Sequence, residues 1–211
     1  MIKNIVFDMG NVLLRFEPEL FIERLGVAPE DRRMLLIEVF RSLEWAKMDR
    51  GSLTERQAAE LICRRVPERL HSAVHSLTDQ WERPILPVEG IYELVEELKN
   101  MGYGLYLLTN ASYRQHDYWP LLPCSKFFDG TLISADVKLV KPQPEIYRLL
   151  FEKFSLVPEE CFFVDDSPAN VEGAGFCGMP GAVFNDGVPA LRRALRQAGI
   201  AVGEQNRSFL S

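Results

Sequence analysis

A chain of 211 residues can form one domain with an insert, and its 47% hydrophobic and 26% charged residues are ordinary for a soluble globular protein. Its 24 Lys and Arg residues against 30 Asp and Glu residues give a net charge of −6 and form no basic run longer than a pair, which excludes the electrostatic footprint of a nucleic-acid-binding protein. No apolar run approaches the length of a membrane span, and the N-terminal apolar stretch reaches Asp8 too early for a signal peptide. We therefore expect a cytoplasmic protein that binds neither nucleic acid nor membrane.

The cysteines show neither Cys-x-x-Cys spacing nor a neighbouring histidine pair; they are Cys63, Cys124, Cys161 and Cys177. Metal and redox sites of the common kinds require such spacing. We expect free thiols in a reducing compartment.

The first predicted element is a strand from Ile2 to Phe7, rich in β-branched residues and apolar without strict alternation. This pattern is typical of a parallel strand covered on both faces. Asp8 and Gly10 follow directly, where the chain leaves the strand. Open α/β sheets carry their chemistry at this position.

Residues 16–83 carry helical patterns and no strand signal. We predict one amphipathic helix from Pro29 to Leu43, a second capped by Thr54, and a third that begins at Pro67. The prediction is a separate all-helical domain of residues 16–83, inserted into an α/β core of residues 1–15 and 84–211. Three tryptophans, Trp45, Trp81 and Trp119, are interpreted as packing residues of the core or of the hinge.

Strands and helices alternate after this region. Predicted helices cover 88–100, 112–122 and 188–197, one opens at Pro142–Pro144 and one at Ser167–Pro168, and predicted strands cover 104–108, 131–133, 161–164 and 181–184. Gly102 is the glycine expected to close the first of these helices, as the C′ residue just beyond its end. A polar tail, Glu204–Ser211, is expected to be loose. Alternation with short links predicts a Rossmann-like parallel sheet flanked by helices.

Polar residues follow three of the predicted strands: Asp8, Thr109-Asn110 and Asp165-Asp166. The carboxyl ends of parallel strands share one edge of a sheet, so we expect these side chains to lie together. Carboxylates suit Mg²⁺, and Lys141 can balance their charge and keep Asp8 ionised. An aspartate can also act as a nucleophile towards phosphorus.

Four segments carry a resemblance to a known family: Asp8-Met-Gly-Asn-Val12, Leu107-Leu-Thr-Asn110, Lys141-Pro142 and Phe163-Val-Asp-Asp166. In this order they resemble the motifs of the haloacid dehalogenase superfamily over roughly residues 1–198, and the helical insert resembles the type-I cap of that family. The opening motif and the polar stretch after Thr109 look most like the glucose-1-phosphate phosphatase branch and the phosphatase-like domain of some epoxide hydrolases.

The resemblance implies a Mg²⁺-dependent phosphatase acting on a small phosphorylated metabolite, in the first place a sugar phosphate. Asp8 would be the nucleophile and a metal ligand, with the Gly10 carbonyl and Asp166 as further ligands and Asp165 orienting a metal-bound water. The phosphate would be bound by Met9, Gly10, Thr109, Asn110 and Lys141, and Lys141 would also act in catalysis. We expect a monomer or weak homodimer whose partner is its small-molecule substrate.

One departure from the family pattern concerns the general acid. Most phosphatases of this superfamily have a second Asp two residues after the nucleophile, where this chain has Gly10. General acid–base catalysis contributes on the order of 10²–10⁴-fold to a rate, so the absence of this acid should lower the reaction rate unless another group replaces it. The residues that could supply the proton instead are Asp49, His71, His75 and His116, and metal-bound water could also do so.

Two other functions stay open at this stage. A 2-haloacid dehalogenase uses the same Asp without a metal and also lacks the second Asp, but the adjacent carboxylates Asp165 and Asp166 argue against it. A non-catalytic or weakly active regulatory module would keep the metal and phosphate sites and lose turnover.

Overall fold

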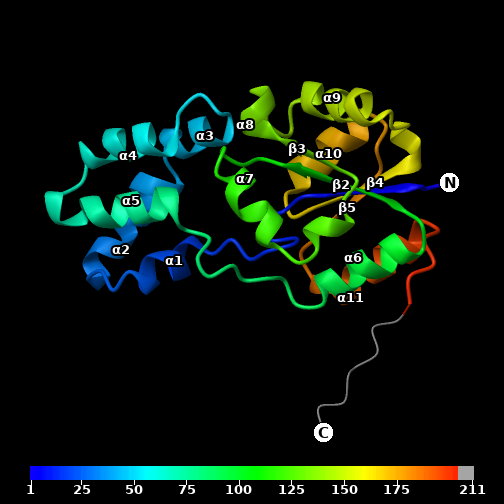
Figure 1. Cartoon of the computed structure of the whole chain (residues 1–211), viewed down its shortest axis with the longest axis horizontal. Helices are drawn as coiled ribbons and strands as arrows, with labels where there is room; N and C mark the ends of the chain where they lie inside the picture. Colours follow the sequence, from blue (N-terminus) through cyan, green and yellow to red (C-terminus); the bar gives the residue numbers. More distant parts are fainter. Residues whose placement is uncertain (204–211) are drawn as a thin grey trace, which may run out of the picture.

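The computed structural model describes residues 1–203, so the predicted polar tail Glu204–Ser211 lies outside the described residues. Within that range a parallel sheet has the strand order β3-β2-β1-β4-β5 (Figure 1). The strands are β1 Asn4–Phe7, β2 Gly104–Thr109, β3 Gly130–Ile133, β4 Cys161–Asp165 and β5 Gly181–Val183. The predicted fold class, a Rossmann-like α/β core with an all-helical insertion, is confirmed.

The central strand β1 fixes where the polar strand ends meet. β1 pairs in parallel with β2 on one side and β4 on the other, with Phe7 beside both Leu107 and Val164. The strand order reverses at β1, and this reversal leaves a crevice at the carboxyl ends of the strands. In both β1 and β4 the next residue along the chain is an aspartate: Asp8 follows Phe7, and Asp165 follows Val164.

Helices cover both faces of the sheet (Figure 1). Ile5 and Phe7 belong to one core with α6 (Ile91–Asn100) and α11 (Gly187–Gln197). Val6 belongs to the opposite core with α9 (Pro144–Phe154) and α10 (Pro168–Phe176). Burial on both faces explains why the first strand is apolar without alternation. Gly102, at φ 89°, follows α6 as predicted.

The helical block, residues 16–83, has a hydrophobic core of its own that includes Phe21, Val39, Ile62 and Leu77. Its helices are α1 Pro18–Arg24, α2 Pro29–Leu35, α3 Leu43–Asp49, α4 Glu55–Cys63 and α5 His71–Asp79. The block lies beside the sheet, at the left of Figure 1. Two short helices of the core face it: α7 Gln115–Tyr118 and α8 Ser134–Val137.

The predicted single helix from Pro29 to Leu43 is divided in the structure. A π-helical turn, Leu36–Phe40, follows α2, and α3 begins after Ser42, whose Oγ accepts the backbone N–H of Trp45 at 3.1 Å. Serine is a strong N-cap, so this position favours a new helix over continuation of the old one. The predicted cap at Thr54 is present as a capping box with Gln57.

Two α-helices within residues 1–203 were not predicted, α1 and α8. Pro18 occupies the first turn of α1, where its missing N–H is not needed. α8 has four residues, too few to show a helical period.

The two connections between the core and the helical block run side by side. Arg15 N–H donates to the carbonyl of Leu86 at 2.7 Å, and Val88 N–H donates to the carbonyl of Leu13 at 3.1 Å.

No helix within residues 1–203 is long and apolar enough to cross a lipid bilayer.

Candidate active site

Three carboxylates from two distant segments meet at the carboxyl end of the sheet. Oxygen atoms of Asp8, Asp165 and Asp166 all lie within 4.8 Å of one another. Asp8 follows β1, Asp165 ends β4, and Asp166 follows it. The strand register explains this meeting, because β1 and β4 are neighbours and end at the same level.

Lys141 supplies the positive charge of this cluster. Its Nζ lies 2.8 Å from Oδ1 of Asp8 and 2.6 Å from Oδ2 of Asp165, and it donates to the carbonyl of Leu108 at 2.9 Å. Burial alone would lower the pKa of this ammonium, but the charges of Asp8 and Asp165 outweigh it, so the pKa of Lys141 is raised. Lys141 is therefore a fixed cation at the edge of the sheet.

Asp165 is fully buried and surrounded by hydrogen-bond donors. Besides Lys141, it accepts the backbone N–H of Ser167 at 2.8 Å and Nδ2 of Asn170 at 3.0 Å. These donors engage both of its oxygens. The contacts make Asp165 a residue that holds Lys141 and the first turn of α10 in place.

Besides its contact with Lys141, Asp8 lines a cavity at this edge of the sheet. Burial is the largest influence on it and raises its pKa to about 6, with the charge of Asp165 adding to the rise and that of Lys141 opposing it. Three carboxylates and one ammonium leave the cluster short of positive charge. An additional cation at this point would restore the balance.

Four of the five residues predicted to bind phosphate line the same cavity: Met9, Gly10, Thr109 and Asn110. The fifth, Lys141, is not among the lining residues and is buried against Asp8. The side-chain amide of Asn110 is already engaged, since its Nδ2 donates to the carbonyl of Lys141 at 3.0 Å and its Oδ1 accepts the Lys141 N–H at 2.8 Å. The sulfur of Met9 accepts a hydrogen bond from Gln115. Asn110 thus fixes the backbone that carries Lys141.

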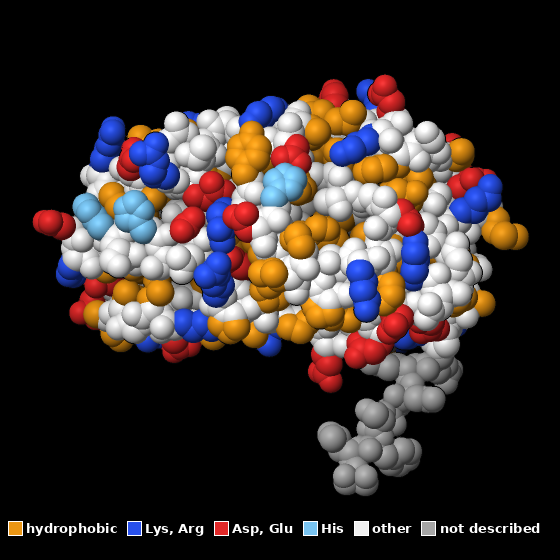
Figure 2. All heavy atoms as spheres, viewed as in Figure 1, with side chains coloured by type: hydrophobic (Ala, Val, Ile, Leu, Met, Phe, Trp, Pro, Cys, Tyr) orange, Lys and Arg blue, Asp and Glu red, His pale blue; other side chains and the backbone are white. Residues whose placement is uncertain are grey.

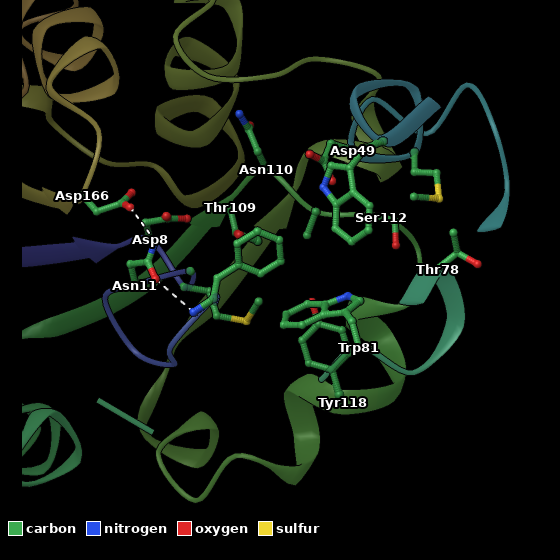
Figure 3. Close-up of a pocket in the computed structure, with 16 residues that line it drawn as sticks. Asp8, Asn11, Asp49, Thr78, Trp81, Thr109, Asn110, Ser112, Tyr118 and Asp166 are labelled. Carbon is green, nitrogen blue, oxygen red and sulfur yellow. Dashed lines mark hydrogen bonds between the residues drawn. The ribbon is translucent and has the colours of Figure 1, made fainter. Parts of the chain in front are cut away.

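The cavity has a volume of about 190 Å³ and lies between the sheet edge and the helical block (Figure 3). Its far wall is aromatic and includes Phe16, Trp45, Trp81 and Tyr118. Trp81 packs on Phe16 with ring centroids 4.9 Å apart. The interpretation of Trp45 and Trp81 as packing residues was incomplete, since both also line the cavity. Trp119 packs on Phe128.

Asn11, part of the opening motif, has hydrogen bonds that shape the turn after β1. Its Nδ2 donates to Oδ2 of Asp166 at 2.9 Å, and its Oδ1 accepts the N–H of Phe16 at 2.9 Å. It adopts φ 55°, a left-handed conformation that asparagine tolerates better than most residues. An asparagine directly after a glycine at a strand end was the signal for this turn.

Of the four residues considered as replacements for the missing acid, one lies at the cavity and three lie outside it. Asp49 lines the cavity, whereas the three histidines do not. His116 pairs with Asp136 at 3.0 Å, and His71 contacts the carbonyl of Val66. His75 is exposed, and Figure 2 shows histidine side chains on the outer surface. The same view shows acidic and basic side chains interspersed over the visible face.

Comparison with known proteins identifies the family. Residues 2–178 match the haloacid dehalogenase-like hydrolase family. The chain belongs to this family. The protein is therefore a haloacid dehalogenase-like hydrolase.

One curated relative and two solved structures show how far the similarity extends. The chain is 29% identical over 207 residues to a phosphorylated carbohydrates phosphatase from Thermotoga maritima, covering 92% of this chain and 90% of the relative. A HAD-like family hydrolase from Porphyromonas gingivalis superimposes with TM-score 0.69 at 26% identity, covering 93% and 98% of the two chains. A HAD family enzyme from Bacteroides thetaiotaomicron, in complex with magnesium and inorganic phosphate, superimposes with TM-score 0.68 at 21% identity, covering 89% and 96%.

Proposed function

We propose that this protein is a Mg²⁺-dependent phosphomonoesterase that hydrolyses a small, sugar-like phosphorylated metabolite through an aspartyl-phosphate on Asp8. The observation that supports it most is the position of Lys141, which is buried between Asp8 and Asp165, next to the cavity that Asp8 lines. A fixed ammonium beside a nucleophilic carboxylate is suited to a reaction in which charge moves onto phosphate oxygens.

The donor set fits a hard divalent cation. Asp8 and Asp166 offer carboxylate oxygens and Gly10 a backbone carbonyl, and the cluster has an excess of negative charge. We assign these three residues as the Mg²⁺ ligands. Asp165 would act from behind them, because its oxygens are engaged by Lys141, Ser167 and Asn170. When bound, the cation neutralises charge on the phosphate and on the carboxylates.

The residues of the chain have distinct tasks in the first transfer. Oδ of Asp8 attacks phosphorus, the bond between phosphorus and the ester oxygen breaks, and the alcohol leaves. Lys141 balances the charge of Asp8 and of the transferring group, while Thr109, Asn110 and the backbone at Met9 and Gly10 orient the phosphate. In the second transfer water attacks phosphorus and Asp8 is regenerated.

The substrate class follows from the size and walls of the cavity. A volume of about 190 Å³ suits a phosphate group with a small organic body, and the aromatic wall suits the apolar face of a ring. The relative from Thermotoga maritima is named for phosphorylated carbohydrates, which is the same class. The helical block would act as a cap domain, residues 16–83, on a core of residues 1–15 and 84–211.

The function is tested with a panel of phosphorylated metabolites, assayed for phosphate release with Mg²⁺ and with EDTA. We expect release that requires Mg²⁺ and that Asp8→Asn abolishes, with circular dichroism showing the variant folded. Turnover that survives chelation would contradict the metal assignment and favour dehalogenase chemistry. Wild-type turnover by Asp8→Asn would refute the mechanism.

A further inference from the structure

Position 10 is a glycine, so the ester oxygen that leaves in the first transfer needs a proton from another group. The side chains lining the cavity that carry or could carry a transferable proton are few: Asp8, Asp49, Thr78, Thr109, Ser112, Tyr118 and Asp166. Asp8 and Asp166 belong to the nucleophile and to the proposed metal ligands. Thr109 would bind the phosphate.

The three remaining hydroxyl groups already donate hydrogen bonds within the protein. Thr78 donates to the carbonyl of Val74, Ser112 donates to Glu55 at 2.6 Å, and Tyr118 donates to the side-chain oxygen of Gln115 at 3.2 Å. Asp49 differs from them. No hydrogen bond to its carboxyl is found among the residues that the structure describes.

The backbone of Asp49 is anchored to the core. Its carbonyl accepts Oγ of Ser134 at 2.5 Å, and Ser134 also accepts the N–H of Ala111 at 2.9 Å, just after the predicted phosphate-binding pair. Gly51 lies so close to α8 that an added Cβ would be 2.2 Å from the carbonyl oxygen of Ala135. The end of α3 therefore docks on the core, and Figure 3 shows Asp49 across the cavity from Asp8.

We infer that Asp49 is the general acid and base of the reaction, which the helical block supplies in place of the absent acid at position 10. This inference rests on the proposed phosphatase function. In the first transfer the breaking bond leaves its electron pair on the ester oxygen, which takes the proton of the Asp49 carboxyl. In the second, the Asp49 carboxylate takes a proton from the attacking water, the bond between phosphorus and Asp8 breaks, and phosphate leaves.

The surroundings of Asp49 keep a proton on it at neutral pH. Burial is the main cause and raises its pKa to about 8, the charge of Asp8 adds to the rise, and that of Lys141 opposes it. Tyr118, whose pKa is raised well above its usual value by burial, also lines the cavity. An acid with a pKa near the working pH can both give and take a proton.

Two ring-sized esters separate proton donation from every other role. The leaving alcohol of benzyl phosphate needs protonation, whereas the 4-nitrophenolate of 4-nitrophenyl phosphate does not. With enzyme in excess and Mg²⁺ present, Asp49→Asn should slow benzyl alcohol formation on the order of 10²–10⁴-fold and leave the first release of 4-nitrophenol unchanged. The exposed acid Asp79, outside the cavity, gives the matched control Asp79→Asn, which should change neither rate.

The base role has a separate signature. With 4-nitrophenyl phosphate in excess, Asp49→Asn should show a burst of 4-nitrophenol followed by a slow steady state, because hydrolysis of the phosphoenzyme lacks its base. The wild-type benzyl phosphate rate should also fall above about pH 8, and Asp49→Asn should lose that dependence.

Different results overturn different claims. Equal slowing of both esters by Asp49→Asn, or slowing of neither, would show that Asp49 is not the acid while the phosphatase function stands. A steady state as fast as that of the wild type would remove the base role. Hydrolysis of neither ester by the wild-type enzyme, together with no release from the metabolite panel, would refute the proposed function and this inference with it.

Discussion

The α/β core and the helical block contribute opposite kinds of side chain to the cavity. The core supplies charged groups that are buried and paired, such as Lys141 between Asp8 and Asp165. The block supplies aromatic rings and one carboxyl, Asp49, for which no partner is found within residues 1–203. Paired charges are held still, whereas an unpaired acid can exchange its proton. The difference suggests that phosphoryl transfer belongs to the core and proton transfer to the block.

Removing the cation of the core should have the largest effect. Lys141→Met leaves two buried carboxylates facing each other, so we expect unfolding to become easier by about 3–5 kcal/mol. Loss of the charge beside Asp8 should also lower the rate by at least 10²–10³-fold, roughly the effect of removing one oxyanion donor. Urea unfolding and phosphate release measure the two effects. The exposed Lys126 gives the control Lys126→Met, which should match the wild type in both; a fully active Lys141→Met would break the division between core and block.

Undocking the end of α3 should disturb activity more than stability. Gly51 adopts φ 69° and abuts Ala135, while Gly26 adopts φ 64° with no atom within 4 Å of an added Cβ. Gly51→Ala and Gly26→Ala therefore share a backbone cost of about 1–2 kcal/mol, and only the first displaces the docked segment. We expect kcat/KM to fall by about 10²-fold in Gly51→Ala and to stay unchanged in Gly26→Ala. Equal kinetics in the two variants would show that docking of this segment is not needed.

The half-buried acid of the block, Asp49, should make folding sensitive to pH. The pKa of Asp49 rises from an ordinary 3.8 to about 8 in the folded protein, so the folded state holds a proton that the unfolded state has lost between these values. Its contribution to stability is complete below about pH 4 and is lost as the pH rises towards 8. Asp49→Asn, which is neutral at every pH, should become more stable relative to the wild type by about 1.4 kcal/mol for each pH unit in the middle of this range. Thermal unfolding at pH 4, 6 and 8 measures the difference; a constant offset would mean that Asp49 is ionised in the fold.

The smallest expected effect concerns the block alone. Thr54 caps α4 through a capping box with Gln57 and does not line the cavity. Thr54→Ala should lower the free energy of unfolding by about 1 kcal/mol and leave kcat unchanged. Denaturant unfolding and steady-state kinetics are the measurements. A large loss of kcat would show that the helices of the block and the site are more tightly coupled than their separate cores suggest.

The core was predictable from the sequence because its rules are local and topological. Each strand was recognised by its apolar run, and parallel order alone brings Asp8, Thr109 and Asp165 to one edge. The hydrogen bonds of Asn110 to Lys141 could not be predicted, since they depend on how two loops approach each other.

The block was predictable only as helices. Asp49 stood beside three histidines as an equal candidate, because nothing in its helical period says which end of α3 meets the core. That contact depends on Ser134 and Ala135, more than 80 residues away in sequence, which lie at a helix too short to leave a pattern. The division of the predicted helix at Ser42 was readable in principle from its N-cap residue.

The central claim is that the core takes the phosphoryl group onto Asp8, and chemical trapping tests it most directly. The enzyme is mixed with Mg²⁺ and substrate, quenched in acid during turnover and reduced with borohydride, which converts an acyl phosphate to an alcohol. Peptide mass spectrometry should then find homoserine at position 8 and an unchanged Asp166. Reduction at any other carboxylate, or no reduced peptide while phosphate is released, would contradict the account.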